Sequence, residues 1–195
     1  MTLKQSPSQT VGPYFAYGLT AEQYGYDFSS IAGGRMADED TDGERIRIVG
    51  RVLDGAGAPV DDAMIEIWQA DSQGRYAHPA DPRGSNLAFK GFGRVGTGTD
   101  PQNRFMFDTV KPGSVGGQAP HVTMCVMARG MLSHAFTRIY FSDEAEANAA
   151  DAVLASVPDK GRGTLIAKRD ETQAGVVYRF DVHLQGDAET VFFDL

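Results

Sequence analysis

Short segments that alternate apolar and polar residues dominate the sequence from residue 44 onward. In the segment Arg45–Leu53, Ile46, Ile48, Gly50 and Val52 fall on one side of an extended chain, and arginines fall on the other. This alternation is typical of a strand with one buried face. An Asp-Gly-Ala-Gly turn follows at once, so the segment predicts the first strand of a hairpin.

Comparable runs bounded by Gly, Pro, Asn or Asp predict further strands. They are residues 64–68, 94–99, 104–110, 121–128, 136–141, 164–168, 176–185 and 190–193. One short helix is predicted near residues 143–156, because alanine dominates its interior and Asp143 with Glu146 forms a capping pair. Strands this short at this spacing predict an all-β fold of the β-sandwich type.

The first 43 residues show little alternation and many Gly, Pro, Tyr and Ser residues. We expect residues 1–43 to form an irregular arm that packs on a partner chain, with one or two helical turns at residues 20–26. Residues 44–195 are expected to form one sandwich domain, since no repeat and no boundary interrupts them. The acidic run at residues 38–42 is expected to be a solvated loop.

The composition narrows the classes of partner. The 195 residues include 18 Lys+Arg and 26 Asp+Glu, a formal net charge of −8, which disfavours binding to nucleic acid and to anionic membranes. The single cysteine, Cys125, excludes an intrachain disulfide and zinc sites built from paired thiols. Because no signal peptide and no membrane-spanning apolar run is recognisable, a soluble cytoplasmic protein is expected.

By themselves, the residues do not assemble a complete active site. None of the four histidines has H-x-H or H-x-x-x-H spacing; His121-Val122-Thr123 comes nearest, and threonine does not replace imidazole on a first-row metal. Cys125 lies within a predicted strand, where a buried and inert thiol is expected. The Gly-rich residues 91–96 lack the following helix that phosphate binding requires.

Two features remain as candidate binding elements. Arg129 directly follows the predicted strand 121–128, and its planar guanidinium suits a carboxylate, although a solvated arginine at a strand end is the ordinary alternative. Residues 9–14, Gln-Thr-Val-Gly-Pro-Tyr, contain Gly and Pro, which end regular structure and let the backbone approach a ligand or partner closely. An ordinary N-terminal arm explains this segment equally well.

A long motif resembles the signature of the intradiol ring-cleavage dioxygenases. It comprises Ile48-Val49-Gly50-Arg51-Val52, Gly57, Val60, Ile65-Glu66-Ile67-Trp68-Gln69-Ala70 and Gly74-Arg75-Tyr76. The resemblance extends over nearly the whole chain through Lys111-Pro112-Gly113, Ala119-Pro120-His121 and Tyr140-Phe141. Residues 8–14 and 186–195 are similar to the alpha chains of the two-chain members of this family.

The resemblance also identifies the family's four positions for ligands of ferric iron, two tyrosines and two histidines. In this sequence they are Tyr76, Val115, His121 and Thr123, so two of the four ligands are lost and the other two are vestigial. A phenolate and one imidazole do not saturate a ferric ion. The resemblance therefore implies no catalytic residue and no metal on this chain, and Fe(3+) bound by a partner beta chain.

The family's reaction implies protocatechuate and O2 as substrates. The ring would be cleaved between the two hydroxyl-bearing carbons to 3-carboxy-cis,cis-muconate, within the β-ketoadipate pathway of aromatic catabolism. The site would lie between the chains of an αβ hetero-oligomer. The substrate-binding residues that the resemblance implies on this chain are Arg129, Thr10, Gly12, Pro13 and Tyr14. A buried carboxylate needs a paired cation, which agrees with this role for Arg129.

Two other interpretations compete with an enzyme subunit. A hairpin like that of residues 50–60 also occurs in non-enzymatic binding modules, the transthyretin-like and carboxypeptidase-regulatory-like sandwiches. Such modules have no reason to keep Trp68-Gln69-Ala70, Gly74-Arg75-Tyr76 or Pro120-His121. A homomeric dioxygenase with a degenerate iron site is disfavoured by Val115 and Thr123.

Overall fold

The protein, seen here as a computed structural model, is described for residues 4, 7, 9–84 and 88–194, without the side chains of Pro13 and Ala16. Its strands are β1 (Arg45–Leu53), β2 (Met64–Gln69), β3 (Phe92–Gly96), β4 (Arg104–Val110), β5 (His121–Met127), β6 (Ala135–Phe141), β7 (Ile166–Thr172), β8 (Gly175–Arg179) and β9 (Val182–His183). Its helices are α1 (Pro13–Leu19), α2 (Ala145–Ala150), α3 (Ala152–Ser156) and α4 (Asp159–Arg162), with 3-10 turns η1 (Ala21–Tyr24) and η2 (Gly163–Leu165). The helices among these residues are all too short or too polar to span a lipid bilayer.

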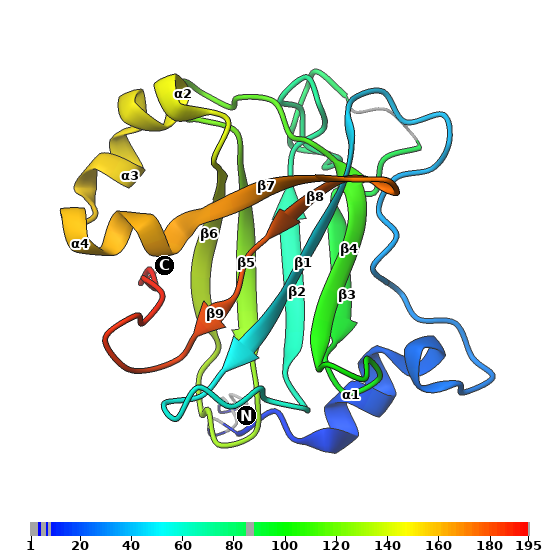
Figure 1. Ribbon diagram of the computed structural model, residues 1–195. Coiled ribbons are helices and arrows are strands. Elements are labelled where there is room, and N and C mark those ends of the chain that lie inside the picture. The colour runs from blue at the N-terminus through cyan, green and yellow to red at the C-terminus, as the bar shows by residue number, and fades with distance from the viewer. Residues whose placement is uncertain (1–3, 5–6, 8, 85–87, 195) are drawn as a thin grey trace.

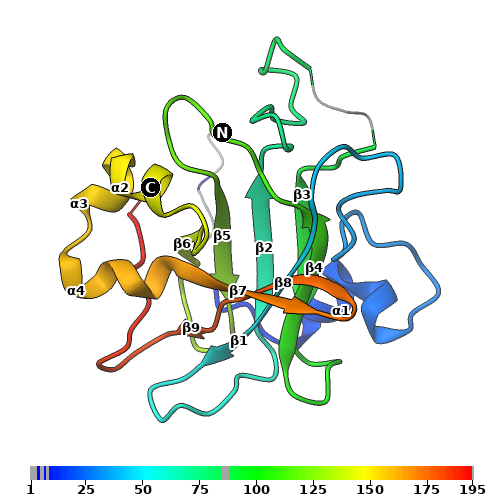
Figure 2. The same cartoon turned by 45° about the horizontal axis from the view of Figure 1, so that its top comes forward.

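The strands form two layers. They pair in the order β3-β2-β5-β6-β7-β8-β1-β4, and β9 pairs with β1. The two layers join where β6 and β7 run parallel, through the pairs Tyr140↔Ile166 and Phe141↔Ala167. From this seam the sheet folds back, so that β7, β8 and β1 lie across β6, β5 and β2 (Figures 1 and 2). The β-sandwich predicted from the sequence is confirmed.

The alternation in the sequence produces the core. In β1, Ile46, Ile48 and Val52 are buried whereas Arg45 and Arg47 are exposed. Other strands of both layers contribute further buried side chains, among them Ile65, Ile67, Phe105, Phe107, Val122, Met124, Ile139 and Tyr178. Each such side chain contributes about 1.5–3 kcal/mol by leaving water, so the apolar faces hold the two layers together.

The helix predicted near residues 143–156 is interrupted at Asp151. Its backbone is extended (φ −76°, ψ 118°), which ends α2 and begins α3. The buried carboxylate of Asp151 accepts hydrogen bonds from the N–H of Leu154 (2.8 Å), the N–H of Ala119 (2.8 Å) and the hydroxyl of Tyr140 (3.2 Å). Asp151 therefore caps α3 and ties the helices to the sheet edge beside them (Figure 1).

The predicted capping pair of Asp143 and Glu146 is wrong. Glu144 is the residue before α2 and makes no side-chain capping bond. The carboxylate of Asp143 instead accepts hydrogen bonds from Lys111 Nζ (2.7 Å) and from the hydroxyl of Tyr178 (2.8 Å). A charge-assisted bond to lysine is stronger than a bond to a neutral backbone N–H, which explains why the local prediction failed.

Several element boundaries also differ from the prediction. Residues 176–185 form two strands, because the side chain of Asp181 leaves the ladder to bind the N–H (2.9 Å) and Nη2 (2.7 Å) of Arg51. Of residues 190–193, Phe193 makes a single bridge to Phe136. Helix α1 was not predicted, although Pro13 occupies its first position, where proline is favoured. The turn expected at residues 20–26 is confirmed by η1.

Part of the N-terminal segment belongs to the sandwich core. Met36 is 1% exposed and lies in the main apolar cluster. The N–H of Met36 donates to the carbonyl of Asp108 (2.9 Å), and the N–H of Asp108 donates to the carbonyl of Gly34 (2.8 Å). Residues 34–36 therefore run beside β4. The division at residue 43 and the contact of residues 1–43 with a partner chain stay predictions.

The close approach of β1 to the segment after β8 gives a stability prediction. A Cβ at Gly50 would lie 1.7 Å from the carbonyl oxygen of Phe180, and a backbone atom cannot move aside easily. We expect Gly50→Ala to lower the free energy of unfolding by about 3 kcal/mol or more, measured by denaturant titration. The control is Gly163→Ala, since Gly163 has helical angles and open space around its Cβ position. Equal effects of the two substitutions would contradict this account.

Candidate functional site

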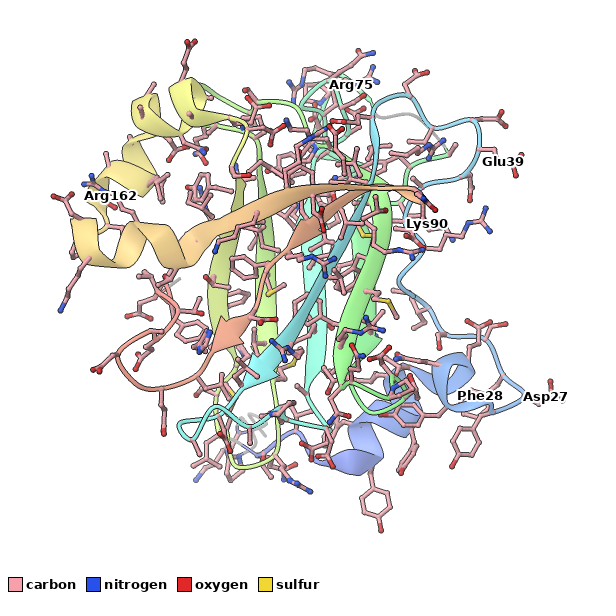
Figure 3. All side chains as sticks on the ribbon, viewed as in Figure 1. Asp27, Phe28, Glu39, Arg75, Lys90 and Arg162 are labelled. Carbon is pink, nitrogen blue, oxygen red and sulfur yellow. The ribbon has the colours of Figure 1, made fainter. Side chains whose placement is uncertain are left out.

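Strand β5 separates the candidate residues into two clusters. His121 begins β5 and Arg129 lies two residues beyond its end at Met127. At a rise of about 3.4 Å per residue, β5 itself spans about 20 Å. The segment after β2, where Arg75 is labelled, lies at the end of the sandwich opposite α1 (Figures 1 and 3). The Arg129 cluster (Thr10, Asp61, Asp62 and Arg129) and the Tyr76 cluster (Trp68, Tyr76, His121 and Arg138) are therefore distinct.

The structure brings Thr10 to the end of β5. Its Oγ1 accepts a hydrogen bond from the N–H of Gly130 (2.7 Å) and donates one to the carbonyl of Ala128 (3.4 Å). These two contacts bracket Arg129, although Thr10 lies 118 to 120 positions away in the sequence. Two candidates that the sequence suggested separately are thus neighbours.

The other candidates of the N-terminal segment follow Thr10 directly. The carbonyl of Gly12 accepts a hydrogen bond from the N–H of Phe15 (3.0 Å) in the first turn of α1. The side chain of Tyr14 is 87% exposed. Pro13 begins α1, and its side chain lies outside the described part of the chain. No substrate contact of these residues is tested by the single chain, so their roles stay predictions.

Two aspartates that the sequence interpretation missed hold Arg129. Its Nη2 lies 3.4 Å from Asp61 Oδ1, and its Nε lies 3.2 Å from Asp62 Oδ2. Both carboxylate oxygens of Asp62 are buried and accept no hydrogen bond among the described residues. Burial raises the pKa of Asp62, while the charge of Arg129 opposes this rise. Arg129 therefore compensates a desolvated carboxylate, yet its own side chain remains 64% exposed. The sequence signal that could have revealed this contact is the Asp61-Asp62 pair just before β2.

Large aromatic side chains are exposed at the same end of the molecule. We define the aromatic patch by its exposed members Tyr14, Phe15, Tyr17, Tyr26 and Phe28. Ring contacts link Tyr17 to Tyr26 (5.9 Å between centroids) and Tyr26 to Phe28 (5.9 Å). Figure 3 shows Phe28 on the segment that follows α1. Exposed apolar groups gathered in this way mark interaction surfaces.

The Tyr76 cluster lies at the opposite end of the sandwich. The rings of Trp68 and Tyr76 are parallel within 2°, with centroids 5.8 Å apart. They line a hollow of about 690 Å³ together with His78, Ala80, Asp81, Pro82 and Arg83. Burial raises the pKa of Tyr76, which keeps its hydroxyl protonated near neutral pH, although the charges of Arg138 and Arg83 act in the opposite sense.

The Tyr76 loop is held by an ion pair. The carboxylate of Asp81 accepts hydrogen bonds from the N–H of Tyr76 (2.9 Å) and from Nε of Arg83 (2.8 Å). Nη2 of Arg83 also donates to the carbonyl of Gly74 (2.9 Å). The guanidinium lowers the pKa of Asp81, so the carboxylate stays charged. Arg83 is therefore committed to holding this loop.

His121 is neutral and has a defined tautomer. Its ring is buried, which lowers its pKa. The Nδ1 atom lies 2.8 Å from the carbonyl oxygen of Ala119, so the proton sits on Nδ1 and leaves Nε2 as an acceptor. Cys125 lies four residues farther along β5 and is half-buried, and burial raises the pKa of its thiol to about 11. This thiol is a poor nucleophile, as the sequence predicted.

A guanidinium lies beside the two remaining ligand positions, Tyr76 and His121. Thr123 pairs across the strands with Arg138 on one side and Trp68 on the other. Nη1 of Arg138 donates to Gln118 Oε1 (2.7 Å), and the charge of Arg138 opposes the rise in the pKa of Tyr76 and helps lower that of His121. No three His, Cys, Asp or Glu side chains gather as a metal site among the described residues. Two remaining ligands beside a cation do not fit a ferric ion.

The sequence model of the dioxygenase family matches residues 12–186. The chain belongs to the intradiol dioxygenase family. This intradiol dioxygenase chain is 57% identical over 197 residues to the protocatechuate 3,4-dioxygenase alpha chain of Burkholderia cepacia, covering 100% of this chain and 99% of that protein. The beta chain from the same organism is 35% identical over 157 residues, covering 74% and 66%. The resemblance to alpha chains of two-chain members is confirmed.

A solved structure supports the fold of this intradiol dioxygenase chain. The dioxygenase domain of a dioxygenase carbohydrate-binding protein fusion from Streptomyces sp. SirexAA-E has a TM-score of 0.62 and 22% identity, covering 84% of this chain and 93% of that one. With the family match, this likeness argues against the transthyretin-like and carboxypeptidase-regulatory-like alternatives. It leaves the predicted substrate contacts untested.

The Tyr76 cluster leads to a metal-binding prediction. We expect the isolated chain, incubated with ferric iron and desalted, to retain no stoichiometric iron and to lack visible tyrosinate-to-iron absorption, because Arg138 repels a cation and two ligands are missing. The measurement is metal content together with the absorption spectrum.

The positive control is the triple variant Val115→Tyr, Thr123→His, Arg138→Gln. It supplies four ligands and removes the cation, and it is expected to gain the absorption. Stoichiometric iron in the unchanged chain would contradict our interpretation of these positions.

Proposed function

We propose that this chain is the alpha chain of a protocatechuate 3,4-dioxygenase. In this proposal a beta chain carries the ferric ion, and this chain supplies the groups that bind the carboxylate of protocatechuate. The assembled enzyme would add O2 across the bond between the hydroxyl-bearing carbons and release 3-carboxy-cis,cis-muconate. The similarity to an alpha chain over the full length supports this proposal.

The position of Arg129 is the observation that carries the proposal. It lies beyond one end of β5, whereas His121 begins the other end and Tyr76 stacks there on Trp68, the partner of Thr123. A strand of about 20 Å between them means that Arg129 cannot reach a substrate bound at this chain's own ligand positions. An arginine placed for a carboxylate at this end therefore serves a site that a second chain completes.

Substrate binding at Arg129 would proceed by exchange of carboxylates. Asp61 is exposed and lies at the longer distance of 3.4 Å, so its contact with Arg129 is weak. Asp62 is buried and holds Nε, which orients the guanidinium while leaving Nη1 and Nη2 for an incoming carboxylate. Once a partner chain excludes water, the ion pair with the substrate becomes stronger.

The aromatic patch is the proposed surface for the beta chain. It adjoins α1 and the Thr10 segment, so a chain bound there would also cover Arg129. Exposed Tyr and Phe side chains are enriched in protein interfaces because they bury large areas at low entropic cost. The proposal includes a hetero-oligomer of αβ protomers and a cytoplasmic location, where a single free cysteine stays reduced.

Arg129→Ala is expected to raise KM for protocatechuate in the assembled enzyme. Removing one partner of a buried charge pair costs about 2–5 kcal/mol, which corresponds to roughly 30-fold or more in affinity. Water entering the vacated space keeps the effect near the lower end of this range. Because catechol has no carboxylate, its KM is expected to rise much less in this variant. Arg129→Lys is expected to restore part of the affinity for protocatechuate, since it keeps the charge but not the planar fork. Steady-state kinetics with both substrates measures these differences.

The matched control is Arg179→Ala, because Arg179 is similarly exposed (57%) and paired with Asp170 on another part of the surface. It is expected to leave both substrates unaffected. If Arg129→Ala raised KM equally for protocatechuate and catechol, Arg129 would not bind the substrate carboxylate, and this part of the proposal would be wrong.

The partner surface gives a separate prediction. Tyr26→Ser combined with Phe28→Ser removes two exposed aromatic side chains and is expected to weaken association with the beta chain at least about tenfold. Analytical ultracentrifugation of the two purified chains measures the dissociation constant. Met106→Ser on β4 is the control, because Met106 is also exposed (37%) and lies outside the patch. Unchanged association of the double variant would place the partner elsewhere.

A further inference from the structure

Arg138 is a half-buried cation without a carboxylate partner. Among the described residues, most arginines form ion pairs, such as Arg83 with Asp81 and Arg94 with Glu66. Within the same residues Arg138 forms none, and the two other arginines without one, Arg35 and Arg45, are exposed. Its Nη1 donates to Gln118 Oε1 (2.7 Å) and to the Tyr140 hydroxyl (3.4 Å). A partly desolvated charge is normally paired, so this arrangement is the signature of a site for an anion.

The nearest linked carboxylate does not neutralise Arg138 directly. Asp151 reaches it through the hydroxyl of Tyr140, which lies 3.2 Å from Asp151 Oδ1. The same carboxylate accepts the N–H groups of Ala119 and Leu154 (2.8 Å each). Within the described part of the chain, Nε and Nη2 of Arg138 make no hydrogen bond, so both remain available to a ligand.

The register of the sheet places a short side chain, Thr123, beside this cation, and we call this position the slot. Trp68, Thr123 and Arg138 are successive partners across β2, β5 and β6, so their side chains share one face of the sheet. Two strand spacings, about 10 Å, separate Trp68 from Arg138. The short side chain of Thr123 lies between these two long ones.

The walls of the slot are apolar and aromatic. Trp68 stacks on Tyr76 and contacts the ring of Phe92 at a tilt of 49°, with centroids 6.5 Å apart. The adjoining hollow of about 690 Å³ adds Ala80 and Pro82, and this volume is in the range of small-molecule sites. One cation beside an apolar wall fits a monoanion with a ring body better than a phosphate, which requires several donors.

We propose that the position where the family holds iron is, in this chain, a binding site for a small aromatic carboxylate, with Arg138 as the cation and Trp68 and Tyr76 as the wall for the ring. The charge of Arg138 acts on both Tyr76 and His121, so these two residues would add polar contacts beside it. This site is at the far end of β5 from Arg129, so it does not depend on the proposed function.

Trp68 makes the proposal directly measurable, because it is the single tryptophan of the chain. The full-length chain, without any partner, is titrated with benzoate while its tryptophan fluorescence is recorded. Benzamide has the same ring without the charge, and acetate has the charge without the ring. We expect a saturable change with benzoate and binding at least about tenfold weaker for the other two. Equal binding of benzoate and benzamide, or no saturable change, overturns the proposal.

Variants of Arg138 then test whether its guanidinium is the cation that binds the carboxylate of benzoate. Arg138→Gln is expected to weaken benzoate binding at least about tenfold, and Arg138→Lys to recover part of the loss. Arg94→Gln is the matched control: Arg94 lies on the same sheet and is paired with Glu66 (2.6 Å), so benzoate affinity stays unchanged. Thermal unfolding followed by circular dichroism verifies that each variant folds. If Arg138→Gln does not fold, the relative binding of benzoate, benzamide and acetate to the unchanged chain still tests whether the site exists. Unaltered benzoate affinity in folded Arg138→Gln overturns the assignment.

Discussion

The antiparallel pairing of β5 between β2 and β6 determines where every candidate group lies. It places His121 opposite Tyr140, and Thr123 between Trp68 and Arg138. A shift of one residue in this register would turn these side chains into the core and bring Val122 and Met124 to the surface. The burial of the apolar set on the other face of β5 therefore fixes the polar arrangement as well.

Near the two ends of β5 lie arginines in different electrostatic states, Arg129 beyond its last residue and Arg138 on the neighbouring strand β6. Arg129 is exposed and balanced by Asp61 and Asp62, whereas Arg138 is half-buried and held by neutral partners, Gln118 and Tyr140. The first arrangement suits exchange with an incoming carboxylate under a covering chain. The arrangement at Arg138 leaves a positive charge unbalanced within one chain. A metal cation requires negative or neutral donor groups instead, so this charge disfavours its binding.

The sequence predicted the parts of the fold that depend on local alternation. Strands β1 and β4 were predicted with their observed bounds, because each alternates cleanly between core and solvent. The helix near residues 143–156 was predicted without its break, since the break depends on the reach of Asp151 to Ala119, which lies in a distant loop. The capping role of Asp143 failed for the same reason, because Lys111 captures the carboxylate from another strand end.

The candidate sites likewise divide into features visible in the local sequence and features created by packing between distant segments. Arg129 and the Thr10 segment were found from strand-end position, Gly-Pro chemistry and the family resemblance, but their contact across the fold was not visible in the sequence. Asp62 and Arg138 were missed altogether. Asp62 gains its importance from burial beneath Arg129, and Arg138 gains its own from the register that sets it beside Thr123. Both are properties of packing between segments far apart in the chain.

The pairing of β1 with β8 has a consequence for how the protein is made. β1 ends at residue 53, and its parallel partner β8 spans residues 175–179. The layer β3-β2-β5-β6 can pair once residue 141 has left the ribosome. β1 and β4 can also pair by then, but the edge of β1 that later binds β8 is still unpaired. Loop closure over such a separation is slow, and open strand edges invite association with other chains. The synthesis of residues 142–179 is therefore the interval in which the nascent chain exposes an unpaired edge of β1.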